Sequence, residues 1–190
     1  MKKALMIVSI LVVAVISTAC INNIAVQELN NKASEYMQKG DYEAAMSRLQ
    51  ASLDLDSSMY QTYYNLGVAS INANKFDKAI EALENGIKIK PDFYDFYYSL
   101  GVAQIGMAED ILEKAEINEE ASADSESGKV DIKREVTPAD KALAVDLRKS
   151  AIDNLNKYLA NAENIQNKDE ITEMIKQSEE EIAKFEEQKD

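Results

Sequence analysis

The sequence predicts an all-α protein built as a short solenoid of helix–turn–helix repeats, and three observations support this. The stretch 60–93 begins again at Tyr94: segments 60–71 and 94–105 are identical at eight of twelve positions, 34 residues apart. Such a period is typical of stacked helix pairs. Apolar and small residues recur at helical spacing within each stretch. Finally, Asn74 and Pro91 stand where helices should stop. We expect about three repeats, the third with an insertion, and a C-terminal capping helix.

The central repeat, 60–93, shows why its two helices should pack closely. One face of its first helix carries Leu66, Gly67 and Ser70. The matching face of its second helix carries Ala79, Leu83 and Gly86, at positions i, i+4 and i+7. Because Gly67 has no side chain, a second helix can approach its backbone closely.

These positions resemble the tetratricopeptide repeat. The family's pattern of an aromatic, Leu-Gly, small residues, a second aromatic and a final proline is matched by Tyr63, Leu66, Gly67, Ser70, Phe76, Ala79, Leu83, Gly86 and Pro91. The one departure is Gly86, where the family prefers Ala; it lowers helix propensity by about 1 kcal/mol but permits close packing. The resemblance implies three repeats, at 26–59, 60–93 and 94–160, within a domain spanning 26–190.

Residues 1–19 have the order of a secretory signal peptide. Lys2 and Lys3 precede the apolar run 4–16, and small residues then lead to Cys20. This resembles a bacterial lipoprotein signal, which implies cleavage before Cys20 and attachment of lipid, palmitate included, to its thiol. The alternative is a signal anchor that is not cleaved. The resemblance implies a lipid-anchored protein of the bacterial cell envelope, at the outer membrane or cell surface in preference to the inner membrane.

The composition limits the partners. The net charge is −13, and so acidic a chain repels nucleic acid. The sequence contains no histidine and one cysteine, so it offers neither the usual base of a catalytic triad nor a disulfide within the chain. We predict no enzymatic activity, no metal, no cofactor and no small-molecule substrate.

Local signals give the helices before the central repeat. Residues 20–25 form a short tether, and Asn23 is expected to cap a helix over about 24–39. Gly40 then provides a C-terminal stop, and Asp41 caps a helix over 42–55.

The third repeat is predicted to be split. We expect its first helix to begin near Tyr94, with Asp92 as its cap, and to continue past residue 105. A flexible, acidic insertion follows near 119–137. Thr137 and Pro138 then start the next helix, and the capping helix covers 168–187.

In the tetratricopeptide family, four positions of each first helix line a concave face that binds protein segments. The resemblance therefore implies partner binding by Gln61, Tyr64, Val68, Ile71, Asp95, Tyr98, Val102 and Ile105. The corresponding first-repeat residues are Gln27, Asn30, Ser34 and Met37. Tyrosine combines apolar area with a polar tip and suits a binding face, but these side chains could instead pack between helices. We thus expect a membrane-tethered scaffold that binds another envelope protein. A self-associating or solenoid-stacking structural subunit is the alternative.

Replacing the cysteine tests the anchor. Cys20→Ser should release the protein from membranes or block its processing, because serine offers no thiol for the lipid. Fractionation of cells that express each version measures this. A serine variant that is processed and membrane-bound like the parent would contradict the lipoprotein prediction.

Overall fold

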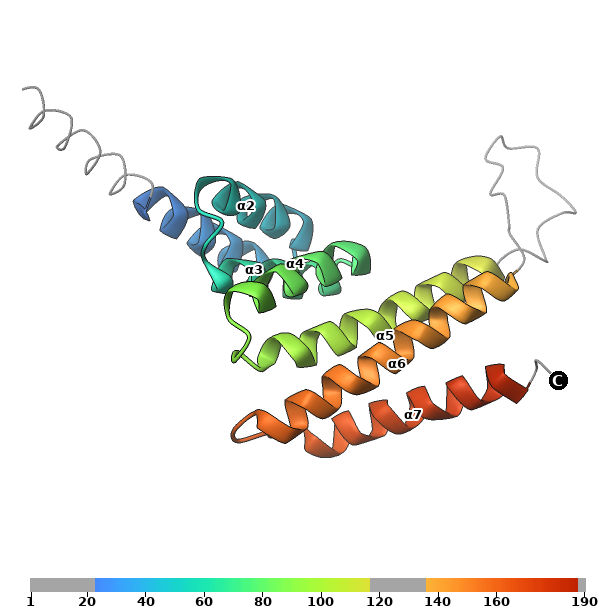
Figure 1. Ribbon diagram of the computed structural model, residues 1–190. Helices are drawn as coiled ribbons and strands as arrows, with labels where there is room; N and C mark the ends of the chain where they lie inside the picture. Colours follow the sequence, from blue (N-terminus) through green and yellow to red (C-terminus); the bar gives the residue numbers. More distant parts are fainter. Residues whose placement is uncertain (1–22, 117–135, 188–190) are drawn as a thin grey trace, which may run out of the picture.

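The computed structural model describes residues 23–116 and 136–187 (Figure 1). Within these ranges the chain forms seven helices and no strand. They are a first helix over 23–38, α2 (Tyr42–Leu55), α3 (Tyr60–Asn72), α4 (Phe76–Ile89), α5 (Asp95–Glu116), α6 (Pro138–Asn161) and α7 (Lys168–Glu187). The predicted signal peptide, Cys20 and most of the predicted insertion lie outside the described residues. None of the described helices is both long and apolar enough to span a bilayer.

Several predicted helix ends are confirmed. Gly40 and Asn74 both have positive φ, at 73° and 53°, and each lies two residues after the last residue of a helix. The carboxylate of Asp41 accepts a hydrogen bond from the backbone N–H of Ala44, which caps α2. Thr137 caps α6, with Pro138 in the first turn.

Two predicted caps are wrong. Asn23 already lies in the first helix, where its side chain accepts a hydrogen bond from Gln27. Asp92 lies three residues before α5 begins at Asp95, and its carboxylate pairs with the ammonium of Lys90 at 3.1 Å. A turn over 91–94 separates the proline from the helix, so an acidic residue directly after the proline comes too early to cap it.

The core of the repeats consists of two apolar clusters that cross the repeat boundaries. One joins the first helix, α2 and α3 and extends to α4; its buried members are Ala33, Ala45, Met46, Leu49, Leu53, Leu66, Ala69 and Ala82. The other joins α4 to α5; its buried members are Ala79, Leu83, Phe96, Leu100 and Ala103. Each repeat therefore buries its apolar face against the next one, as a solenoid requires.

Glycines mark the closest helix approaches. A methyl group added at Gly67 would lie 2.5 Å from Cγ of Leu83, and one at Gly101 would lie 2.7 Å from Cγ of Leu155. Gly67 and Gly101 are equivalent in the 34-residue repeat, so Leu155 of α6 is equivalent to Leu83 of α4. The helix α6 is thus the second helix of the third pair.

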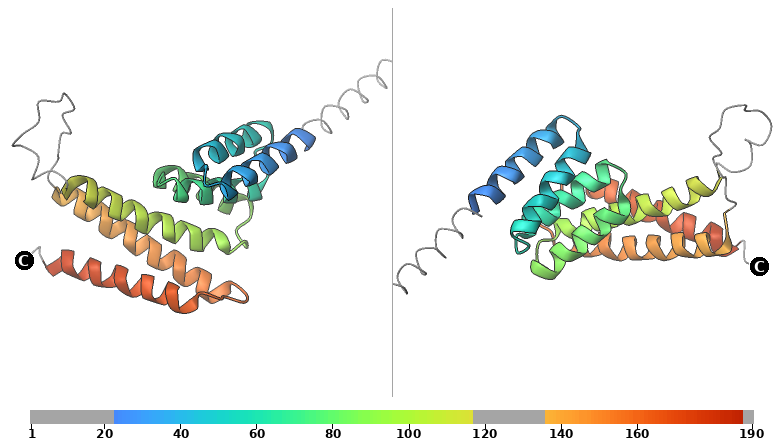
Figure 2. Two further views of the ribbon diagram at one scale, coloured as in Figure 1. Left: turned by 180° about the vertical axis from the view of Figure 1, so that it is seen from behind. Right: turned by 90° about the horizontal axis from the view of Figure 1, so that it is seen from above.

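The third pair is longer than the others and carries the final helix. α5 and α6 have 22 and 24 residues, against 13 and 14 in α3 and α4. They lie side by side in Figures 1 and 2, and Gln104 and Asn154 join them by a 2.9 Å hydrogen bond. α7 packs on α6 through buried Ile171 and Ile182. Its outer face is charged, which suits the end of a solenoid.

The approach at Gly67 can be tested by overpacking. Gly67→Leu should lower the free energy of unfolding by about 1–3 kcal/mol, because the new side chain must displace Leu83 or separate the helices. Urea unfolding measures the effect. Val68→Leu, one residue on and only partly buried, is the matched control and should change it little. Equal stability of the parent and Gly67→Leu would show that α3 and α4 do not pack as described.

Candidate partner-binding surface

The eight residues predicted to bind a partner are called here the first-helix face. Those on α3 are Gln61, Tyr64, Val68 and Ile71, and those on or at the start of α5 are Asp95, Tyr98, Val102 and Ile105. Gln61 is exposed and the other seven are partly buried. Side chains at i, i+3 and i+7 of a helix share one side, so Asp95, Tyr98 and Val102 follow one another along α5.

Tyr64 packs between repeats as well as reaching the surface. Its ring meets those of Phe93 and Phe96 edge-on, with centroids 5.2 and 5.7 Å apart. Burial raises the pKa of the Tyr64 phenol, and the nearby side chain of Ser99 on α5 partly offsets this rise. The packing role that sequence left open therefore applies to much of this ring.

Tyr98 faces the C-terminal helices. Its ring lies 5.4 Å from that of Tyr158 on α6, with the planes inclined by 40°. Asn167, which directly precedes α7, is close enough to Tyr98 to affect the pKa of its phenol. The sequence analysis gave Tyr158 no role. Its signal was a large aromatic at the position of Gly86, where the repeat prefers a small residue.

The first-repeat counterpart of these tyrosines, Asn30, is partly buried. Its side-chain amide donates a 2.7 Å hydrogen bond to the hydroxyl of Ser52, and its carbonyl oxygen accepts one from Thr62 at 3.2 Å. Ser52 and Thr62 are fully buried, so Asn30 joins the first helix, α2 and α3. Its predicted place on the concave face stays a prediction.

Beyond Tyr98, α5 and α7 form the walls of a groove with α6 as its floor. This α5–α7 groove has a volume of about 250 Å³. Its lining residues are Ile105, Glu109, Arg148, Met174, Gln177, Ser178, Glu180 and Glu181. Ile105 on α5 and Met174 on α7 give this groove an apolar part, while partner binding by Ile105 stays a prediction.

Arg148 lies beneath this groove and was missed by sequence reasoning. Only 5% of it is exposed, and its Nε–H has no hydrogen-bond partner among the described residues. It interrupts the stripe Ala144, Ala151 and Leu155, which is fully buried on α6. An arginine in such a stripe was the available signal, because buried charges need partners.

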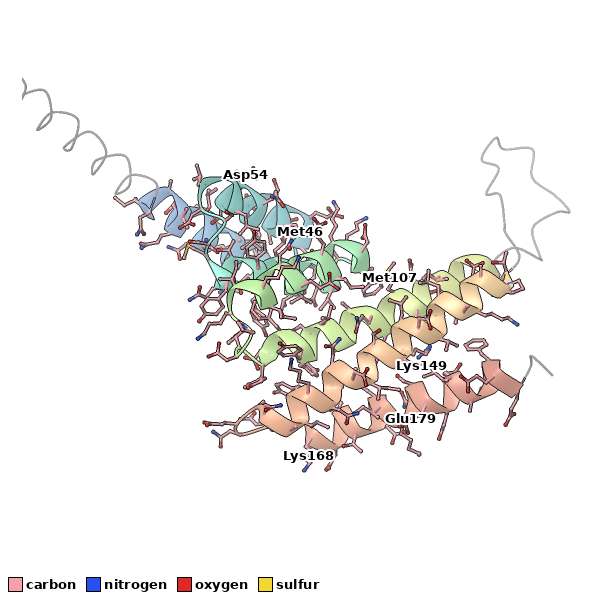
Figure 3. The ribbon with its side chains drawn as sticks, viewed as in Figure 1. Met46, Asp54, Met107, Lys149, Lys168 and Glu179 are labelled. Carbon is pink, nitrogen blue, oxygen red and sulfur yellow. The ribbon has the colours of Figure 1, made fainter. Side chains whose placement is uncertain are left out.

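A second cleft lies between α2 and α4, the second helices of their pairs. Its volume is about 600 Å³. Its lining includes apolar Met46, Leu53, Tyr63, Leu66 and Ala82 and the charged residues Glu43, Asp54, Lys78 and Glu81. Met46 and Asp54 lie along α2 in Figure 3. The sequence did not predict this cleft, because the spacing of residues along one helix does not show how far apart two helices lie.

The comparisons agree with this architecture. The tetratricopeptide repeat family matches residues 36–105, which include α2, α3 and α4 and the first half of α5. The crystal structure of MamA is similar with a TM-score of 0.44 and 20% identity, over 84% of this chain and 79% of that chain. No curated protein matches the chain. The family match covers residues 36–105, and the described chain has an all-α helical-repeat fold like that of tetratricopeptide repeats. Such domains are generally protein-interaction scaffolds and usually not enzymes.

The surface around Tyr64, Tyr98 and Tyr158 is acidic as well as aromatic. Burial raises the pKa of all three phenols above 10.0. The charge of Asp95 raises the pKa of Tyr64 and Tyr158 further, and that of Glu170 raises the pKa of Tyr98. Each phenol is therefore held neutral in the folded chain, in a field that disfavours anions.

These shifts predict alkaline destabilisation. A folded-state pKa above the unfolded value contributes stability that is complete below about pH 10 and is lost as pH rises through the folded-state pKa. The unfolding free energy should therefore fall above pH 10. It should fall less steeply in a variant combining Tyr64→Phe, Tyr98→Phe and Tyr158→Phe. Urea unfolding between pH 9 and about 11.5 gives both slopes, and equal slopes would contradict the assignment.

Proposed function

We propose that this protein is a membrane-tethered, non-enzymatic adaptor of the bacterial cell envelope that binds a segment of a partner protein along its first-helix face. The observation that carries the proposal is the partial exposure of Tyr98, Val102 and Ile105 along one side of α5. Ile105 lies on the wall of the α5–α7 groove. An apolar and aromatic strip beside a groove suits an extended peptide.

The tether rests on the Lys–apolar–small–Cys order of residues 1–20. With lipid on Cys20, only two residues separate the anchor from Asn23, where the first described helix begins. The three Cα–Cα steps from residue 20 to residue 23 span at most about 11 Å. The repeats would then act close to the bilayer surface, and their partner would be a protein of that membrane or one that reaches it.

A structural subunit that stacks on itself or on another solenoid is the second candidate. Leu55 and Ile89 end the second helices α2 and α4, stand 34 residues apart and are 42% and 41% exposed. Leu143 on α6 is 46% exposed. Contact with another helical repeat would cover such residues.

Site-specific photocrosslinking in intact envelopes distinguishes the two. A benzoylphenylalanine at position 61 or 105 should crosslink to a distinct partner protein, because both positions belong to the first-helix face. The same group at position 55 or 143 is the matched control and should not capture that partner. Ile105→Glu should abolish the crosslink from position 61 while helicity measured by circular dichroism is retained. Crosslinks only between copies of this chain, formed from positions 55 and 143, would support the structural subunit instead.

A further inference from the structure

Four residues of three helices lie near the start of α5 and are called here the tyrosine–aspartate cluster: Tyr64, Asp95, Tyr98 and Tyr158. The rings of Tyr98 and Tyr158 lie 5.4 Å apart. Asp95 and Tyr98 are three residues apart on α5 and so share a side of that helix. Tyr64 and Tyr158, from α3 and α6, are both close enough to feel the charge of Asp95. All four residues are partly buried and partly open to solvent.

Asp95 lacks the cation that a partly buried carboxylate usually has. Among the described residues it makes no ion pair or side-chain hydrogen bond. Of the nearby lysines, Lys90 pairs with Asp92, and Lys157 lies 4.0 Å above the ring centre of Tyr97. Neither ammonium group is therefore placed on Asp95. Its position in the first turn of α5 is favourable, because the positive end of the helix dipole stabilises a carboxylate there. The dipole does not supply a cation on the side of the carboxylate that faces solvent.

The surroundings select the charge of a ligand. A carboxylate together with the negative faces of aromatic rings attracts a cation. Glu170, beside Tyr98, strengthens this attraction and repels anions. The contact of Lys157 with Tyr97 shows that a cation stacks on a tyrosine of this same helix.

We propose that the tyrosine–aspartate cluster binds an arginine side chain of the partner segment. A guanidinium can stack on a phenol ring and donate two parallel hydrogen bonds to a carboxylate, whereas an ammonium is a compact, strongly hydrated charge. Arginine therefore binds more tightly than lysine here. The proposal rests on the proposed function and deepens it, because it gives the partner segment an arginine that binds near the start of α5, on the first-helix face.

The probe is the peptide acetyl-Gly-Arg-Gly-amide, added to the full chain with ring-labelled tyrosine. NMR titration should show saturable shifts at Tyr64, Tyr98 and Tyr158, with a dissociation constant in the millimolar range for a single residue. The citrulline peptide, neutral and nearly isosteric, should bind at least ten-fold more weakly, and the lysine peptide several-fold more weakly. Added salt should weaken the arginine peptide.

Asp95→Asn should reduce affinity for the arginine peptide at least five-fold. Asp92→Asn is the matched control, an exposed carboxylate three residues earlier, and should leave affinity unchanged. If Asp95→Asn proves unfolded by circular dichroism, Tyr158→Leu replaces it, and the same loss is expected. Equal binding of the arginine and citrulline peptides, or undiminished binding by a folded variant of the cluster, would overturn the proposal.

The two proposals fail separately. If the arginine peptide does not bind but positions 61 and 105 still crosslink to a partner, only the cation site is refuted. If the peptide binds at the cluster but no partner crosslinks, the cation site stands and the adaptor function is refuted.

Discussion

The arrangement of the repeats depends on how Phe96 fills the space beside Gly86. Phe96 is the largest fully buried side chain among the described residues. A side chain at position 86 would overlap the ring of Phe96, so only a glycine there leaves room for this ring. Around Phe96 stand Tyr60, Tyr64 and Phe93, with ring centroids 5.2–6.4 Å away. The tilted and edge-on geometries are the favourable ones for aromatic pairs. This contact fixes α5 against α4, and with it the place of Asp95 and Tyr98.

The same junction occurs between successive repeats with different chemistry. Asn30 hydrogen-bonds both Ser52 and Thr62, and the residues 34 positions after these three are Tyr64, Gly86 and Phe96. One set is polar and mutually satisfied, and the other is aromatic around a glycine. In the third pair, Tyr98 and Tyr158 form the junction. A solenoid of similar helices could pair out of order, but exchanging these junctions would bury an unpaired amide against aromatic rings. The difference thus favours one order of stacking.

Much of the fold could be predicted because its signals are local. Gly40, Asp41, Asn74, Thr137 and Pro138 act within a turn of their own positions. The close approach at Gly67 followed from repeat spacing. The binding surface could not be divided into packing and exposed parts in this way. Whether Tyr64 faces solvent depends on Phe93 and Phe96, and the α5–α7 groove depends on where α7 lies.

The two faces of the final helix α7 have different surroundings and therefore different residues. Toward α6 it must be apolar, and Ile171 and Ile182 are buried there. Toward α5 it stands apart, and the Nε–H of Arg148, which lines the groove between them, has no hydrogen-bond partner among the described residues. The carboxylates on its rim are engaged elsewhere: Glu180 pairs with Lys176 and Glu181 with Lys184, both on α7 itself. These exposed ion pairs contribute little to stability. They pair the two glutamates with lysines of α7 itself. Because α7 stands apart from α5, the groove between them stays open, with Ile105 and Met174 on its two walls.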